Sequence, residues 1–172
     1  MVFNIYGCKL KIDFSFFLII AFSVLFNAKS LLKLLIFASF HELGHIVSLY
    51  LMKSRPSNIN ISFYGIGLKH NAKLSTLNEL IFLLSGIAVN TVFFLLNVEQ
   101  DTNYRLIAVN ALPVLPLDGG RALSLFVPDG IMKMISAVCL VLLALFSLIS
   151  LNLSLLIIVV YIFVYSYFEE EL

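Results

Sequence analysis

Charged residues are scarce in this chain of 172 residues. Only 12% of the residues are charged, whereas 61% are hydrophobic. Soluble domains average about 45–50% apolar and about 25% charged residues. A soluble domain of this length could not bury so much apolar surface. The composition therefore excludes a soluble globular protein and predicts an all-α polytopic membrane protein.

Cysteine and net charge are also low. The two cysteines, Cys8 and Cys139, lie far apart and form no CxxC or related pattern, so we interpret them as packing residues that say little about redox compartment. The formal net charge is +1, which provides no basic surface for nucleic acid. The expected partners are therefore the lipid bilayer and membrane-associated proteins.

Long apolar runs fill most of the chain. Because a membrane helix needs about 20 largely apolar residues, we expect six spans, near residues 13–28, 31–52, 77–98, 104–127, 130–149 and 151–168. Lys9 and Lys11 before the first run resemble the start of a signal peptide, but the run ends in Phe-Asn-Ala and further spans follow. We therefore interpret it as a retained helix, and residues 1–172 as a single membrane domain.

One sizeable polar insert, KSRPSNINISFYGIGLKHNAK (residues 53–73), separates the second and third spans. Hydrophobic and polar residues alternate from Ile59 to Phe63, and Gly65 and Gly67 follow. Period-two alternation with glycine predicts a small membrane-associated β-hairpin between the second and third helices. Its strands could lie in the membrane interface or pair with an extended substrate peptide, and the pattern alone leaves both interpretations open.

Basic residues in the short loops favour a cytoplasmic N-terminus, because cytoplasmic loops carry an excess of Lys and Arg. One side of the membrane would receive Lys9, Lys11, Lys53, Arg55, Lys69, Lys73 and Lys133. The opposite side would receive Lys29, Lys33 and Arg105. We therefore expect a multi-pass cell-membrane protein with its N-terminus inside.

Three ionisable residues, His41, Glu42 and His45, interrupt the second apolar span within the motif HELGH. Two histidines four residues apart lie on one helix face, about 6 Å apart along its axis, and can hold one Zn²⁺. Glu42 could then act as general base on a zinc-activated water. A charged side chain at the centre of a membrane helix costs about 2.5–3.5 kcal/mol on insertion scales. We therefore interpret the group as a metal site rather than a chance match.

A third zinc ligand is expected at Asp118, in the segment NALPVLPLDGGRAL (residues 110–123). A catalytic zinc site has three protein ligands and one open position. His41 is 11 residues from the expected cytoplasmic end of its span, and Asp118 is 9 from its own. Both would therefore lie roughly 14–17 Å below the cytoplasmic surface. The sequence thus predicts one Zn²⁺ per chain, held by His41, His45 and Asp118, whereas His70 lies in the polar insert.

Prolines and glycines surround Asp118. Pro113 and Pro116 precede it and would break regular helix geometry, which is tolerated at membrane depth only where the backbone is buried or lines a cavity. Gly119 and Gly120 follow it and would permit close approach to a neighbouring helix.

Two asparagines are candidates for contact with substrate. Gly86 and Asn90 lie four residues apart on one face of the third span, which is typical of a small-residue packing seam. Alternatively, Asn90 could stabilise the oxyanion of a hydrolysed amide. Asn110 could hold the broken segment by hydrogen bonds or contact substrate. The spacing leaves these alternatives open.

Taken together, HELGH, SGIAVN and NALPVLPLDGGR resemble the site-2 proteases, a family of zinc-dependent intramembrane metalloproteases. The order and membrane setting of the motifs match over nearly the whole chain, and six spans with an acidic end look most like the sporulation branch, which releases a sigma factor from a membrane-bound precursor. Ile87 stands where the family often has proline. The nucleotide-sensing regulatory domain of the sporulation protease and an inserted peptide-binding domain are both expected to be absent.

The resemblance implies His41, His45 and Asp118 as zinc ligands, Glu42 as catalytic base, and Asn90 and Asn110 as residues that position substrate or stabilise the transition state. It also favours pairing of substrate with the hairpin, at Ser62, Phe63, Tyr64 and Gly65. We therefore expect an intramembrane zinc endopeptidase that cuts a membrane-associated protein, such as a pro-sigma factor, under membrane inhibitor or activator proteins. The alternatives are a multi-pass metal-ion transporter and an inactive relative that anchors membrane proteins.

Overall fold

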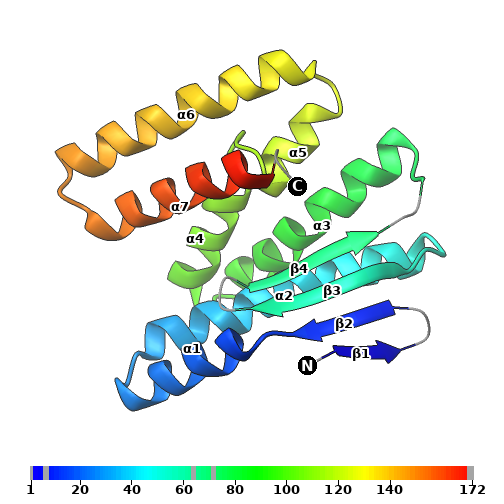
Figure 1. Ribbon diagram of the computed structural model, residues 1–172, viewed down its shortest axis with the longest axis horizontal. Coiled ribbons are helices and arrows are strands. Elements are labelled where there is room, and N and C mark those ends of the chain that lie inside the picture. The colour runs from blue at the N-terminus through cyan, green and yellow to red at the C-terminus, as the bar shows by residue number, and fades with distance from the viewer. Residues whose placement is uncertain (1, 6–7, 63–64, 71–72, 170–172) are drawn as a thin grey trace. The chain divides into compact units, whose positions relative to one another are not determined.

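The computed structural model describes residues 2–5, 8–62, 65–70 and 73–169 of the chain. The chain divides into two compact units, Met1–Ala108 and Val109–Leu172, and each is described by itself. Figure 1 shows the ribbon with its elements labelled.

A four-stranded mixed sheet and four helices make up the first unit. The strands are β1 (Val2–Ile5), β2 (Cys8–Ile12), β3 (Pro56–Ser62) and β4 (Gly65–His70), and the sheet order is β1-β2-β3-β4. Both hairpins are antiparallel, and β2 pairs with β3 in parallel. The helices are α1 (Phe14–Leu25), α2 (Lys29–Leu51), α3 (Thr76–Leu95) and α4, Gln100–Asn110, which continues past the boundary of the unit.

The hairpin expected in residues 53–73 is confirmed as β3 and β4, but the first hairpin was not predicted. Its strands are only 4 and 5 residues long, too short to give a strong alternation signal. The pattern in β2 is nevertheless present, because Lys9 and Lys11 are exposed while Leu10 and Ile12 are partly buried. The expectation of a mostly helical protein with one small hairpin is therefore correct for most of the described chain, and β1 and β2 are the strands that it left out.

Three of the six expected spans are confirmed as helices long and apolar enough to cross a membrane: α2, α3 and α6 (Asp129–Ile149). Two other apolar helical stretches are shorter, α1 and residues Leu155–Val164 within α7 (Leu153–Glu169). The expected span over residues 104–127 is not a single membrane-crossing helix. That segment contains the end of α4, an irregular stretch and the short helix α5 (Asp118–Ser124).

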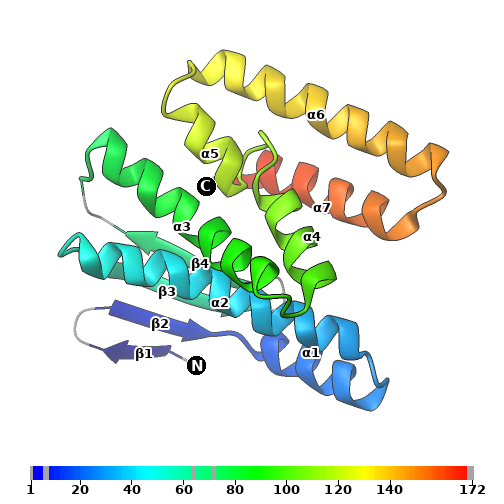
Figure 2. The ribbon, with the colours of Figure 1, turned by 180° about the vertical axis from the view of Figure 1, so that it is seen from behind.

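Close contact between α2 and α3 organises the first unit, and both ribbon views show the two helices side by side, next to β3 and β4 (Figures 1 and 2). A Cβ atom on Gly44 would lie 2.7 Å from the main-chain oxygen of Ser85 and 2.9 Å from Val89. Only glycine allows α3 to approach α2 this closely at position 44. The site residues of α2 therefore face α3 at short range.

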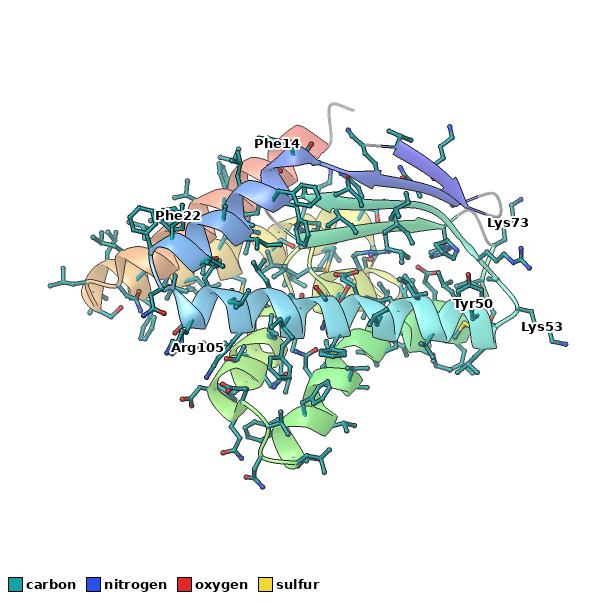
Figure 3. The ribbon with its side chains drawn as sticks, turned by 90° about the horizontal axis from the view of Figure 1, so that it is seen from below. Phe14, Phe22, Tyr50, Lys53, Lys73 and Arg105 are labelled. Carbon is teal, nitrogen blue, oxygen red and sulfur yellow. The ribbon has the colours of Figure 1, made fainter. Side chains whose placement is uncertain are left out.

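Basic residues lie at both ends of α2. Lys53 and Lys73 lie near Tyr50, at the end where α2 stops, and Arg105 lies toward the other end of the helix (Figure 3). Near that other end, Lys33 forms an ion pair of 2.7 Å with Glu99. The middle of α2, which carries His41 to His45, is thus separated by turns of helix from the charged residues at both ends.

In the second unit, α6 and α7 run side by side (Figure 1), and their core contains Val114, Leu140, Val159 and Ile162. The irregular stretch before α5 is packed into this core, because Val114 is fully buried and the main-chain nitrogen of Leu115 donates to Ser136 Oγ at 3.1 Å. The predicted break of helix geometry at the prolines is therefore confirmed. At its centre Val114 is fully buried, in keeping with the burial that broken helix geometry requires at membrane depth.

Gly119 and Gly120 allow close approach of the irregular stretch before α5, whereas the sequence predicted close approach of a neighbouring helix. A Cβ atom on Gly119 would lie 2.5 Å from the main-chain oxygen of Ala111, and one on Gly120 would overlap the carbonyl of Val114. The two glycines therefore let the preceding chain fold back over the first turn of α5. Asp118, the first residue of that turn, is 9% exposed.

Candidate metal centre

His41, Glu42 and His45 form a group of potential metal ligands on α2. One ligand atom from each residue lies within 4.8 Å of the others. Both histidines are buried, with exposed fractions of 3% and 4%, and their ring centroids are 4.9 Å apart. Ligand atoms on one tetrahedral zinc, with bonds of about 2.0–2.1 Å, lie roughly 3.4 Å apart. The side chains are therefore close to the spacing that a shared ion requires.

The tautomer of His45 is fixed by a main-chain oxygen. His45 Nδ1 lies 2.7 Å from the carbonyl oxygen of Phe82, and Ser85 Oγ donates to the same oxygen at 2.6 Å. A carbonyl oxygen only accepts, so Nδ1 must carry the hydrogen. Nε2 of His45 is then the nitrogen with ligand chemistry, and a hydrogen bond from the other nitrogen is the usual support of a histidine ligand.

His41 is held in the same way by a side chain of α3. Its Nδ1 lies 3.1 Å from Asn90 Oδ1, and Asn90 is fully buried. The amide nitrogen of Asn90 donates in turn to Asn103 Oδ1 at 3.1 Å. An amide oxygen only accepts, so His41 also carries its hydrogen on Nδ1. Both imidazoles therefore offer Nε2 as the ligand atom.

Gly86 keeps the space around these nitrogens open. A Cβ atom on Gly86 would lie 2.6 Å from His45 Nε2 and would overlap His41 Nε2. Both Nε2 atoms thus face the same point on α3, where a side chain is missing. Two imidazoles, a nearby carboxylate and a cradle that one methyl group would fill fit a zinc ion.

Two other predicted site residues come later in the chain. Asp118 begins α5, and Asn110 ends α4. Both belong to the second unit, and their roles at the site stay predictions. Asn90 is brought to His41, but its amide bonds both His41 and Asn103, so a direct substrate role would require Nδ2 to leave Asn103.

The predicted substrate-pairing segment spans the turn of the second hairpin. Ser62 is paired with Gly65 across β3 and β4, and Phe63 and Tyr64 lie outside the described residues. The outer edge of this hairpin belongs to β4, because β4 stands last in the strand order of the described chain.

His70 on β4 lies near the metal group although the sequence places it in a polar insert. Its ring packs edge-on against Phe82 at 4.8 Å between centroids, and the ring of Phe82 lies 5.0 Å from that of His45. His70 Nε2 is 3.6 Å from a carboxylate oxygen of Glu79 on α3. One phenylalanine thus separates β4 from the metal group.

Sequence reasoning missed the residues that support the histidines from α3 and α4, namely Ser85, Asn103 and the carbonyl of Phe82. Nothing in the local pattern marks a main-chain oxygen as a hydrogen-bond acceptor. Asn103 lies among polar residues at the start of α4, so its complete burial gives no signal in the sequence.

Comparison with known proteins shows a similarity among solved structures. Searches of protein-family models and of curated proteins found no match. Among solved structures, the chain is similar to the site-2 protease from Methanocaldococcus jannaschii, with a TM-score of 0.62 and 22% sequence identity over 94% of this chain and 91% of that chain. The two proteins therefore share a fold over nearly their full lengths.

Proposed function

We propose that this protein is a zinc-dependent intramembrane endopeptidase that cuts a membrane-associated protein within or beside its membrane segment. The observation that carries the proposal is the buried His41-Glu42-His45 group, with both Nε2 atoms turned to one point beside Gly86. The shared fold with a site-2 protease supports the same activity. A soluble metalloprotease is excluded by the apolar helices that hold the group.

Each proposed site residue has a separate role in peptide hydrolysis. His41 and His45 hold the ion, and Asp118 is proposed as the third ligand because its carboxylate completes the three-ligand set of a catalytic zinc. Bound zinc supplies a Lewis acid that activates water and polarises the scissile carbonyl. Glu42 accepts a proton from the attacking water and then delivers it to the leaving amine, so that the C–N bond breaks to a carboxylate and an amine.

Asn110 is proposed to donate a hydrogen bond to the carbonyl oxygen as negative charge develops on it, or to fix the substrate main chain beside it. This role is compatible with its place at the end of α4, directly before the irregular stretch. Asn90 is a weaker candidate for this hydrogen bond to substrate, because its amide oxygen already accepts from His41 and its amide nitrogen donates to Asn103.

Substrate is proposed to bind as an extended strand along β4. This strand ends the sheet order and contacts α2, the helix that carries the metal group. An edge strand presents unpaired main-chain groups that an extended peptide can satisfy. Such pairing would also unwind the substrate helix, whose scissile amide is otherwise hidden in its own hydrogen bonds.

The resemblance to the sporulation branch supplies one substrate class to examine first, a membrane-bound precursor of a sigma factor. Its cleavage would release a transcription factor from the membrane. The same resemblance gives membrane inhibitor or activator proteins as the proposed regulators, and a cytoplasmic N-terminus as the proposed orientation.

The decisive experiment compares the wild-type protein with Glu42→Gln in proteoliposomes that contain candidate transmembrane substrates. We expect site-specific cleavage by the wild type, loss of at least about 100-fold of the rate in the variant, and equal zinc content in both, because the proposal makes Glu42 the general base and His41, His45 and Asp118 the ligands. Near-normal turnover by Glu42→Gln would overturn the proposed mechanism.

The same vesicles separate a protease from a metal transporter. A transporter needs metal-binding groups along a path across the bilayer, whereas within the described residues one group of three potential ligands was found. We therefore expect no zinc flux above that of protein-free vesicles. Flux without any cleavage of substrate would favour the transporter.

A further inference from the structure

A chain of hydrogen bonds leads from His41 to the turn between α3 and α4. His41 Nδ1 donates to Asn90 Oδ1 at 3.1 Å, and Asn90 Nδ2 donates to Asn103 Oδ1 at 3.1 Å. Asn103 Nδ2 then donates to the main-chain oxygens of Val98 at 2.8 Å and Glu99 at 3.2 Å. The chain thus joins a candidate metal ligand to a turn that lies outside the metal group.

The direction of every bond in this chain is set at the turn. Two carbonyl oxygens face one end of the Asn103 amide, so that end must be the NH₂ group. The oxygen of Asn103 therefore points to Asn90, which must present its own NH₂ group to Asn103 and its oxygen to His41. The opposite orientation of either amide would place oxygen against oxygen or nitrogen against nitrogen.

We propose that Asn103 is a positioning residue for the metal centre, which fixes the Nδ1–H tautomer and ring orientation of His41 through Asn90. The inference deepens the proposed function and rests on it, since it takes His41 to be a metal ligand. Without this relay the neutral imidazole could carry its hydrogen on either nitrogen, and the Nε2–H form cannot bind a metal through Nε2. Asn103 therefore keeps His41 ready for the ion before the ion arrives.

Complete burial of the two amides argues against an incidental contact. Asn90 and Asn103 are both 0% exposed, and a buried polar group without a partner costs about 1–3 kcal/mol. Apolar residues of similar size would give a packed seam between α3 and α4 without that risk. Instead, two buried amides hold one histidine in a fixed orientation by hydrogen bonds. Supporting hydrogen bonds of this kind are typical of metal-binding histidines.

The turn that anchors the relay has a defined shape. Asn97 and Glu99 both adopt positive φ, at 59° and 45°, so the main chain turns sharply and directs the Val98 and Glu99 carbonyls at Asn103. Lys33 at the start of α2 holds the side chain of Glu99 in an ion pair. The geometry of this turn is therefore transmitted to His41 through two amides.

The test reads the tautomer directly. The chain has three histidines, so nitrogen NMR of histidine-labelled, metal-free protein in detergent micelles can assign His41, with His70→Gln and His45→Gln used to identify the other two rings. We expect the wild type to show hydrogen on Nδ1 of His41. A wild-type His41 with its hydrogen on Nε2 would overturn the proposal without any variant of the relay.

Asn103→Leu removes the relay at nearly constant volume. We expect a mixture of tautomers at His41 and a loss of roughly 10–100-fold in Co²⁺ affinity, the usual effect of a lost partner behind a metal ligand, measured from the visible spectrum of the bound ion. Thr91→Val is the matched control, because Thr91 lies next to Asn90 on α3 and its hydroxyl donates to the helix carbonyl of Ile87 at 2.8 Å rather than to the relay. It should leave both readouts unchanged.

Two outcomes remain informative whatever the protein cleaves. If Asn103→Leu keeps the His41 tautomer and its Co²⁺ affinity within twofold of Thr91→Val, Asn103 has only a structural role and the inference is wrong. If both readouts shift as expected while the wild type cleaves no substrate, the relay stands and the proposed protease function fails.

Discussion

Gly86 lies so close to His41 that any side chain at position 86 would occupy the site of the metal. A Cβ atom there would overlap His41 Nε2 and lie 2.6 Å from His45 Nε2. Helix formation itself would favour alanine over glycine by about 1 kcal/mol. The glycine therefore opposes local helix propensity, and the metal group is the reason that the structure provides.

Gly86→Ala is accordingly expected to lower Co²⁺ or Zn²⁺ affinity by roughly 100-fold, more than the 10–100-fold typical of a lost supporting contact, because the methyl group displaces the ligand atoms themselves. Gly130→Ala on α6 is the control, since its Cβ atom would meet nothing within 4 Å. Metal titration of the purified proteins provides the measurement. Equal affinity in the two variants would show that the Nε2 atoms do not face the ion.

Gly44 makes a different prediction, because its Cβ would press on main chain rather than on a ligand. The nearest atom would be the Ser85 oxygen at 2.7 Å, and main-chain atoms cannot move aside as a side chain can. Gly44→Ala should destabilise the metal-free protein by about 1–3 kcal/mol through overpacking of α2 against α3. Thermal unfolding in detergent would measure this, and a rise in the melting temperature would contradict the close approach.

Ser136 tests whether the irregular stretch before α5 needs its anchor on α6. Ser136→Ala leaves the partly buried main-chain N–H of Leu115 without the bond that it now makes at 3.1 Å, so a loss of about 1–3 kcal/mol is expected. Ser147→Ala removes an equally buried hydroxyl, but that hydroxyl bonds a carbonyl within its own helix, so no group loses its only partner. Denaturant unfolding should therefore give a lower free energy of unfolding for Ser136→Ala than for Ser147→Ala. Equal free energies would show that the bond from Leu115 to Ser136 does not stabilise the stretch.

The sequence predicted the metal group well because its chemistry is local. Two histidines at i and i+4 with a neighbouring glutamate share one helix face by helix geometry alone, and the structure confirms that their ligand atoms converge. The hairpin of residues 56–70 was also predicted, since β3 alternates in polarity and glycines punctuate β4.

What the sequence could not predict depends on contacts between elements. The support of His45 by the Phe82 carbonyl and of His41 by Asn103 through Asn90 arises only when α3 and α4 pack beside α2. The first hairpin escaped prediction because its pairing with β3 is parallel and non-local. The extent of the span over residues 104–127 was not predicted, because hydropathy measures apolar content and does not show how far Pro113 and Pro116 interrupt the helix inside it.

Strand pairing of the substrate with β4 leads to the last prediction. A peptide paired along one edge directs every second main-chain N–H toward its neighbour. Replacing single amides of a cleaved transmembrane peptide by esters should therefore lower kcat/KM in alternation along the segment that lies on β4. Each lost hydrogen bond, at about 0.5–1.5 kcal/mol, corresponds to roughly 2- to 13-fold, while esters at the intervening positions, whose N–H groups face away, act as internal controls. A uniform effect at every position, or none, would place the substrate elsewhere than on this edge.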